Sequence, residues 1–251
     1  MHRSVARVAD SLTIVIPAYN EAGRLGASLR QLADWLDRHA PSAQVIVVDD
    51  GSTDATLTLA RTLATADPRL TVAALGRNRG KGAAVRRGVE LAEREWILFT
   101  DADFSTPIDE LPRLAARAEA GADIVIGSRD HAEAQVEQRQ PLYRETMGRI
   151  FNRLVRGLAL PGFSDTQCGF KLLRRTAAKR CFARQTIERF AFDVEILFVA
   201  RQLGLRIDEV GVRWRNDERS TVHPVRDAGR MLLDVARIRY RHRGHADRQA
   251  G

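Results

Sequence analysis

The side chains best suited to chemistry in this 251-residue chain are the acidic groups of three short segments. These segments cover residues 17–21, 49–52 and 101–103, and the first also carries the aromatic ring of Tyr19. An Asp-x-Asp pair in a cleft costs electrostatic free energy unless a cation compensates its charge. Its hard oxygens suit Mg²⁺ or Mn²⁺ bridging two phosphates, and such an ion neutralises charge that develops on a diphosphate leaving group. The acidic segments therefore predict a divalent-metal site for a phosphorylated nucleotide.

A glycine-flanked lysine adds a second anion-binding feature. Lys81 lies between Gly80 and Gly82, just before a predicted helix, and the N-terminus of a helix favours anions. Only three of the 40 basic side chains are lysines, which indicates that this position needs one. The chain lacks the P-loop pattern G-x-x-x-x-G-K-[ST], so a nucleotide hydrolase is not expected.

The elements that must position these residues alternate between strand and helix. Short apolar, β-branched runs predict strands at residues 12–16, 44–48, 70–74, 96–100 and 123–127. Repeated βα units of this length predict an α/β fold with a doubly wound, mostly parallel sheet. Ligands bind beyond the carboxyl ends of such strands, so we expect the acidic segments to form one cleft. Taken alone, the Asp-Asp-Gly-Ser segment could also be a turn that caps a helix.

The charge of the chain is uneven. The net charge is +8, and residues 226–251 contain seven arginines and three aspartates, which gives 7 − 3 = +4 in that tail. Such a tail suits a polyanion, for example phospholipid head groups or a phosphorylated ligand, or is merely solvated. No recognisable nucleic-acid-binding motif accompanies it, so nucleic acid is not an expected partner. Cys168 and Cys181 have no metal-ligand spacing and are expected to be ordinary buried thiols.

Two predicted amphipathic helices bear on location. No stretch approaches the roughly 18 apolar residues of a spanning helix, and residues 1–10 lack the apolar core of a signal peptide, which predicts a cytoplasmic protein. Residues 144–158 and 226–243 could either pack on the sheet or lie peripherally on the cytoplasmic face of an anionic membrane. The apolar face of the second helix consists of four residues at helical spacing: Met231, Leu232, Val235 and Ile238.

Eight segments together resemble a known family. Those of the first half are IVIPAYNE (14–21), VVDDGSTD (47–54), NRGKG (78–82) and TDAD (100–103), and they look like the inverting glycosyltransferases of family 2, which have the GT-A fold. Those of the second half are GSR (127–129), DTQCGFK (165–171), FAFDVE (190–195) and VRW (212–214). They resemble the branch that contains the dolichyl-phosphate β-glucosyltransferases and other polyprenyl-phosphate glycosyltransferases.

The resemblance implies a metal-dependent reaction that inverts the sugar. A hexose, glucose by resemblance, would pass from a nucleotide-sugar donor, UDP-glucose, to a polyprenyl or dolichyl phosphate. GDP-mannose as the donor, or a soluble or polysaccharide hydroxyl as the acceptor, remains the alternative. A nucleotide-sugar pyrophosphorylase would carry a glycine- and arginine-rich loop in place of residues 17–21. A catalytically inactive nucleotide-binding module would usually have lost Asp101 or Asp103, and both are present.

The resemblance also implies the roles of individual residues. The nucleotide-sugar-binding residues would be Pro17, Tyr19, Glu21, Asp49, Asp50, Lys81, Asp101, Ala102, Asp103 and Arg215. The two aspartates of the Asp-x-Asp pair, Asp101 and Asp103, would hold Mg²⁺ or Mn²⁺. Arg129 and Lys171 would face the acceptor phosphate. Asp165 and Asp193 are the two candidates for an acceptor-side catalytic carboxylate, and the sequence does not rank them.

The resemblance covers one predicted domain, residues 11–240. Its parts are a Rossmann-like nucleotide-sugar-binding half (11–128), an acceptor half (129–225) and a basic amphipathic C-terminal helix (226–243). We expect residues 130–141 to form a loop, and residues 1–10 and 244–251 to be flexible termini.

Overall fold

The computed structural model describes residues 7–138, 157, 160–215 and 224–242. The predicted helix at 144–158 lies outside these residues except for Gly157, as do residues 1–6 and the predicted C-terminal flexible segment. Residues 7–10 were expected in a flexible terminus. They instead form a helical turn, because Val8 and Ala9 are buried in the main apolar core.

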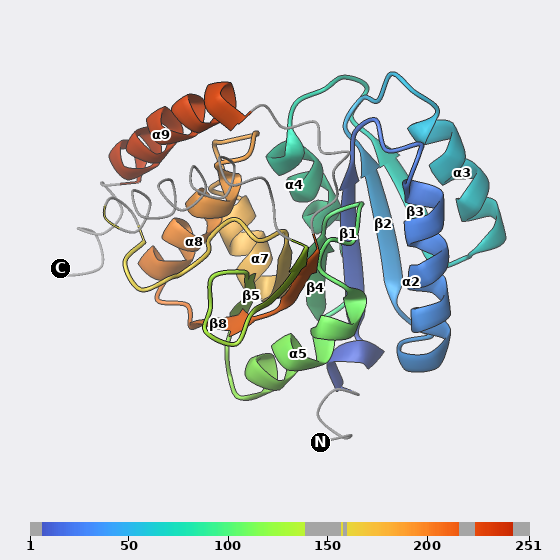
Figure 1. Cartoon of the computed structure of the whole chain (residues 1–251), viewed down its shortest axis with the longest axis horizontal. Helices are drawn as coiled ribbons and strands as arrows, with labels where there is room; N and C mark the ends of the chain where they lie inside the picture. Colours follow the sequence, from blue (N-terminus) through green and yellow to red (C-terminus); the bar gives the residue numbers. More distant parts are fainter. Residues whose placement is uncertain (1–6, 139–156, 158–159, 216–223, 243–251) are drawn as a thin grey trace.

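Within the described residues, seven strands form the central sheet in the order β3-β2-β1-β4-β7-β5-β8 (Figure 1). Their bounds are β1 (Leu12–Ala18), β2 (Gln44–Asp49), β3 (Leu70–Ala74), β4 (Trp96–Thr100), β5 (Ile124–Ser128), β7 (Phe170–Arg174) and β8 (Ile207–Gly211). All neighbours pair in parallel except β7, which runs antiparallel to both β4 and β5. The inner strands β4 and β5 are buried along their whole length, and β1 is buried except at Pro17, as expected for strands covered on both faces. The predicted α/β class with a mostly parallel sheet is confirmed.

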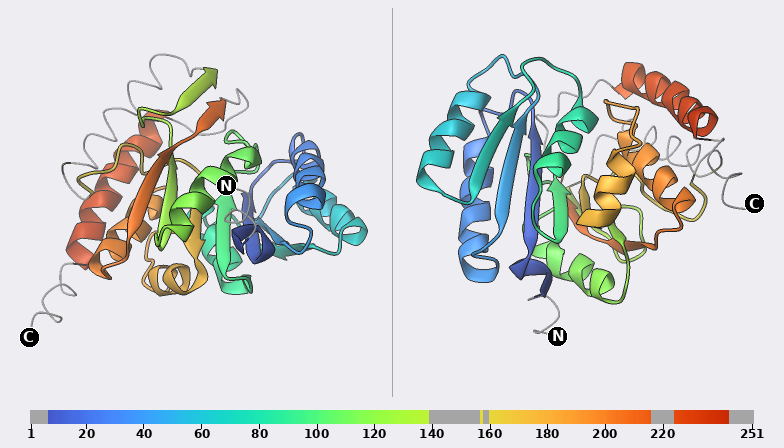
Figure 2. Two further views of the ribbon diagram at one scale, coloured as in Figure 1. Left: turned by 90° about the horizontal axis from the view of Figure 1, so that it is seen from below. Right: turned by 180° about the vertical axis from the view of Figure 1, so that it is seen from behind.

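Helices cover both faces of the sheet (Figure 2). Those whose apolar side chains join one core are α2 (Leu25–His39), α3 (Thr56–Ala66) and α5 (Leu111–Glu119), the last preceded by the short helix η1 (Ile108–Glu110). Those that join the opposite core are α4 (Lys81–Leu91), α7 (Arg175–Phe182), α8 (Phe192–Gln202) and α9 (Pro224–Arg241). The sheet therefore lies between two apolar layers, and the described helices do not cover the carboxyl ends of its strands, where the site is expected.

The prediction of a loop at residues 130–141 is partly wrong, because this segment contains a strand. Strand β6 (Gln135–Gln138) pairs in parallel with β9 (Arg213–Arg215), which places Val136 opposite Trp214. The segment has no apolar alternation because most of its side chains are exposed, and its partner lies more than 70 residues away in the sequence. This small sheet brings Arg215 close to the end of β4, since its N–H donates to the carbonyl of Ser105 (2.9 Å).

Candidate active site

The three acidic segments meet at one edge of the sheet. Strands β2 and β4 both pair in parallel with β1, so residues 17–21, 49–52 and 101–103 all follow carboxyl ends on the same side. The N–H of Asp50 also donates to the carbonyl of Ala18 (2.8 Å), which ties the first two segments together. The three segments that were expected to form one cleft therefore lie at one edge of the sheet.

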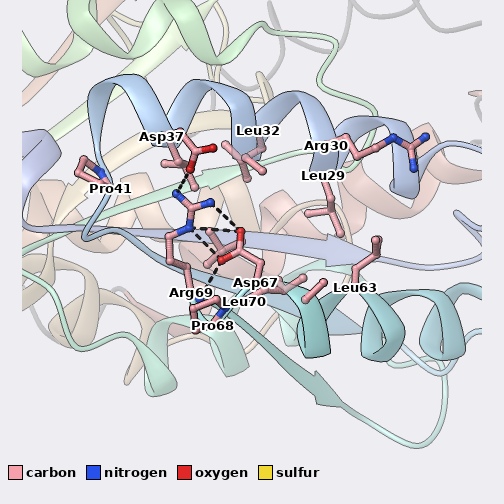
Figure 3. A pocket seen from close by; sticks show the side chains of 14 residues that line it. Leu29, Arg30, Leu32, Asp37, Pro41, Leu63, Asp67, Pro68, Arg69 and Leu70 are labelled. Atoms are coloured by element: carbon pink, nitrogen blue, oxygen red, sulfur yellow. Dashed lines mark hydrogen bonds and ion pairs between the residues drawn. The ribbon is translucent and has the colours of Figure 1, made fainter.

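A cavity elsewhere in the fold has a different character. It has a volume of about 550 Å³ and is lined by one side of α2 and by residues 63–70, none of which belongs to the acidic segments. Figure 3 shows Arg69 at its rim between Asp37 and Asp67, with ion pairs of 2.8 Å to each. We therefore place the candidate active site at the strand ends.

The loop after β1 forms one end of the site. Tyr19 is 37% exposed and available for stacking, whereas Pro17 is still part of β1. Glu21 is bound to Arg24 in a two-point ion pair. Arg24 also approaches Asp103, with 3.8 Å between Nη1 and Oδ2, so it connects this loop to the Asp-x-Asp pair. The sequence reasoning missed Arg24, and no motif marked it.

The adjacent aspartates after β2 hold loops. Asp49 accepts the N–H groups of Gly51 (3.1 Å) and Ser52 (3.2 Å), which is the turn that the sequence alone also allowed. The buried carboxylate of Asp50 accepts the N–H groups of Arg79 and Gly80, both at 2.8 Å. Burial raises the pKa of Asp50, and these hydrogen bonds offset only part of the shift. The contact of either carboxylate with a nucleotide stays a prediction.

Lys81 and the Asp-x-Asp pair form a compact group of charges. Lys81, the first residue of α4, lies 2.6 Å from Oδ1 of Asp101. Burial lowers the pKa of Lys81, but the carboxylates of Asp101, Asp193 and Asp103 outweigh this effect and raise it. Burial and the charge of Asp101 raise the pKa of Asp103. Ala102, between the two, points into the core and separates them on the chain.

The pair has the properties of an incomplete metal site. No group of three or more His, Cys, Asp or Glu side chains within the described ranges could hold a metal. Asp101 and Asp103 supply hard oxygen ligands whose mutual repulsion a cation would relieve. Further ligands would then come from donor phosphates and water, as is usual for Mg²⁺.

Gly169 was missed as a site residue, although it lies in one of the family-like segments. A Cβ atom added to it would lie 2.7 Å from Oδ1 of Asp101 and closer still to Oδ2. Glycine at this position therefore lets the carboxylate lie directly against the backbone. The signal in the sequence was the glycine of DTQCGFK, residues 165–171.

Asp165 is fully buried and forms a two-point ion pair with the partly exposed Arg129. Nε and Nη2 of the arginine lie 2.6 and 3.0 Å from the two carboxylate oxygens. Burial raises the pKa of Asp165, but the charge and hydrogen bonds of Arg129 outweigh it and lower the pKa to about 2. Arg129 keeps part of its side chain exposed and lies over the ring of Trp214. Asp165 thus fixes the orientation of this arginine.

Lys171 and Asp193 form a second ion pair, and both side chains of this pair are buried. Nζ of Lys171 donates to Oδ1 of Asp193 and to the carbonyl of Cys168, both at 2.6 Å, and lies over the ring of Phe99. Burial raises the pKa of Asp193 despite Lys171 and Lys81 nearby. The predicted acceptor contact of Lys171 needs correction, because its ammonium is buried and held by protein groups. Lys171 is buried and holds the carboxylate of Asp193.

The comparisons with known proteins agree with this geometry. A sequence model of glycosyl transferase family 2 matches residues 13–182. The chain belongs to this family. The family 2 chain is 38% identical over 248 residues to the dolichyl-phosphate beta-glucosyltransferase of Mus musculus, covering 92% of this chain and 75% of the relative. It is 35% identical to the protein of the same name from Dictyostelium discoideum, covering 92% and 74%.

Solved structures show the fold of this glycosyltransferase. Mannosyl-3-phosphoglycerate synthase from Rubrobacter xylanophilus superposes with a TM-score of 0.69 at 21% identity, covering 97% of this chain and 78% of the other. Glucosyl-3-phosphoglycerate synthase from Mycobacterium tuberculosis, solved with Mn²⁺, UDP and glucosyl-3-phosphoglycerate, has a TM-score of 0.65 at 19% identity, covering 94% and 80%. The GT-A fold predicted from the sequence is confirmed.

Proposed function

We propose that this glycosyltransferase transfers glucose from UDP-glucose to dolichyl phosphate or a related polyprenyl phosphate. The observation that carries the proposal is the identity of 35–38% over about nine tenths of the chain to relatives named dolichyl-phosphate beta-glucosyltransferase. The ion pair of Arg129 with the buried Asp165 supports it, because it holds a cation beside the donor edge, where an acceptor phosphate needs one.

The donor diphosphate would lie among Lys81, Arg215 and the Asp-x-Asp pair. Arg215 is exposed, and its backbone N–H donates a hydrogen bond to the carbonyl of Ser105 in the loop that follows Asp103. Lys81 and Arg215 would bind and orient the phosphates, while Asp101 and Asp103 would hold Mg²⁺ or Mn²⁺. When bound, that ion neutralises charge on the diphosphate leaving group.

The acceptor needs little help from a base. A phosphate monoester has its second pKa near 6, so most of it is already dianionic at pH 7. Asp165, with a pKa of about 2, is a poor proton acceptor and acts by orienting Arg129. One phosphate oxygen would attack the anomeric carbon as the bond from that carbon to the diphosphate breaks. This single displacement turns an α-linked donor into a β-linked product.

The experiment is a transfer assay with Mn²⁺, short dolichyl and polyprenyl phosphates, and a panel of nucleotide sugars. We expect a glucosyl lipid phosphate from UDP-glucose and β stereochemistry by NMR. Mannosyl product from GDP-mannose alone would overturn the donor assignment. Transfer only to hydroxyl acceptors would overturn the acceptor assignment.

We also propose that the enzyme reaches its lipid acceptor from the cytoplasmic side, by peripheral contact of α9 with an anionic membrane. No helix in the described part of the chain is long and apolar enough to cross a membrane. Of the two alternatives left open for this helix, packing on the fold holds for Val235 and Ile238, which are buried against the core that includes α8. Leu233 and Tyr240 are exposed instead, by 62% and 77%.

Spacing and charge support this second face of α9. Leu233, Arg237 and Tyr240 follow at intervals of four and three residues, so they share one side of the helix. Arg239 and Arg241 are exposed beside them. Each such charge near an anionic surface contributes on the order of 1 kcal/mol. In Figures 1 and 2, α9 lies level with the strand ends that carry the site, where a lipid phosphate would have to arrive.

Vesicle co-sedimentation tests the membrane contact. The Leu233→Ser, Tyr240→Ser double variant should bind phosphatidylserine-containing vesicles much more weakly than the wild type, and wild-type binding should weaken with salt. Val136→Ser is the matched control, because Val136 is a 40% exposed apolar side chain on β6. Equal sedimentation of the double variant and the wild type would overturn this docking face.

A further inference from the structure

A loop from the second half of the chain supports the donor-phosphate loop. Residues 185–189 lie against residues 79–86, more than 90 residues away in the sequence. The carbonyl of Glu188 accepts the N–H of Ala83 (3.0 Å), and its carboxylate pairs with Arg79 and Arg86. The Nη1 of Arg86 also donates to the carbonyl of Gln185 (3.4 Å).

The contact between the two loops is close. A Cβ atom on Gly80 would lie 2.5 Å from the Glu188 carbonyl, and one on Gly82 would lie 2.8 Å from Gln185 Nε2. Lys81 lies between these glycines. Any displacement of residues 185–189 is therefore transmitted to the backbone that carries Lys81.

The loop is itself held by one buried carboxylate. Glu195 on α8 is fully buried and accepts the N–H groups of Thr186 (2.9 Å) and Ile187 (2.8 Å) and the hydroxyl of Thr186 (2.7 Å). Burial raises the pKa of Glu195, but hydrogen bonds from His242, Thr186 and Ile187 outweigh it and lower the pKa. The group is therefore an ionised acceptor at neutral pH, and such hydrogen bonds are roughly twice as strong as neutral ones.

His242, at the end of α9, completes the arrangement. Its Nε2 lies 2.9 Å from Oε1 of Glu195, and because an ionised carboxylate only accepts, the ring nitrogen donates. The ring is buried beside Phe198, and the His242 carbonyl accepts from Gln202 Nε2 (2.6 Å). Both side chains are buried, so neither is available to take part in the chemistry described above.

We propose that Glu195 and His242 are positioning residues for the donor diphosphate, acting through residues 185–189 on the loop of Lys81. This inference rests on the proposed function, since it concerns the same donor site. The C-terminal end of α9 would then help to position the donor site. The helix α9, for which we propose membrane contact, is thus connected through His242 and Glu195 to residues 185–189, which support the loop of Lys81.

Calorimetric binding of UDP and GDP in the presence of Mn²⁺ tests the inference without the acceptor. Glu195→Gln puts an amide where two N–H groups need acceptors, and it should weaken nucleotide binding about tenfold. His242→Leu should weaken it severalfold, while His242→Gln, which keeps a donor, should restore most of the affinity. The donor KM should rise in parallel, and the acceptor KM should stay unchanged.

Asp67→Asn is the matched control, because that carboxylate also caps a loop N–H group, that of Arg69, but lies outside the site. It should lower the melting temperature without changing nucleotide affinity. If folded Glu195→Gln and His242→Leu bind nucleotide as tightly as the wild type, the inference is overturned. If Glu195→Gln does not fold, the two His242 variants decide. A wild type that binds neither nucleotide would instead count against the proposed function.

Discussion

Replacing Gly169 by alanine would show whether catalysis depends on the position of Asp101. Gly169 does not have a positive φ, so alanine can adopt its backbone conformation and the added Cβ atom is the only change. That atom would lie 2.7 Å from Oδ1 of Asp101 and closer still to Oδ2. Because the neighbour is a side chain, Asp101 is the group expected to give way.

The size of the shift follows from van der Waals contact. Ordinary contacts begin at 3.4 Å, so Oδ1 must retreat by at least 3.4 − 2.7 = 0.7 Å, and Oδ2 by more. This movement disturbs the 2.6 Å ion pair with Lys81 and displaces a proposed metal ligand. A misplacement on the order of 1 Å can cost about 10²-fold in rate, so we expect kcat to fall about 100-fold.

Steady-state glucose transfer with Mn²⁺, together with thermal unfolding, measures the effect. The control is Gly26→Ala in α2, where the new Cβ atom would have no contact shorter than 3.6 Å. It should keep wild-type kinetics and gain up to about 1 kcal/mol of stability from the less flexible unfolded chain. A folded Gly169→Ala enzyme with wild-type kcat would refute the reasoning, since Asp101 would then not need its present position.

Three further predictions concern the charged groups. Asp103→Asn should cut turnover by orders of magnitude with little change in melting temperature, and excess EDTA should abolish wild-type activity; full activity in EDTA would end the metal-dependent interpretation. Because the pKa of Asp165 is lowered to about 2, its ion pair should add about 2–3 kcal/mol to the free energy of unfolding above pH 4. That contribution should disappear as the pH falls toward 2, so the difference between wild type and Asp165→Asn, measured by denaturant unfolding, should narrow; a constant gap would contradict it. Asp193→Asn should lower the pH–rate profile without changing its shape, since acceptor ionisation near pH 6 sets the acidic limb; loss of that limb would identify Asp193 as a general base.

Much of the fold could be predicted because its strands are apolar runs between glycines and acidic turns. The run at residues 96–100, for example, forms β4 as expected. Strand β6 could not be predicted in this way. Its side chains are polar or half-exposed, and what makes it a strand is pairing with β9, a contact that no local pattern encodes.

The residues of the site could be predicted from the sequence, but the burial of their side chains could not. The shared edge of the acidic segments follows from parallel strands. The type of a charged residue does not show whether its side chain reaches solvent. Lys171, for example, is buried in an ion pair with Asp193. Likewise, the helical spacing in α9 identified an apolar face, but only the packing shows that Ile238 is buried while Tyr240 is exposed. Glu195 ends the family-like segment at residues 190–195, but that segment did not show that its carboxylate holds a loop.

The antiparallel strand β7 has a consequence for how the protein is made. It lies between β4 and β5, so β5 has no direct ladder with the strands that precede it in the chain. On the ribosome, Ser128 at the end of β5 is followed by 170 − 128 − 1 = 41 residues before β7 begins at Phe170. At about 5–20 residues per second this interval lasts roughly 2–8 s, during which β4 and β5 are open, apolar edges. A nascent chain at this stage is open to aggregation, because β4 and β5 can be joined in one sheet only after residues 170–174 have been made.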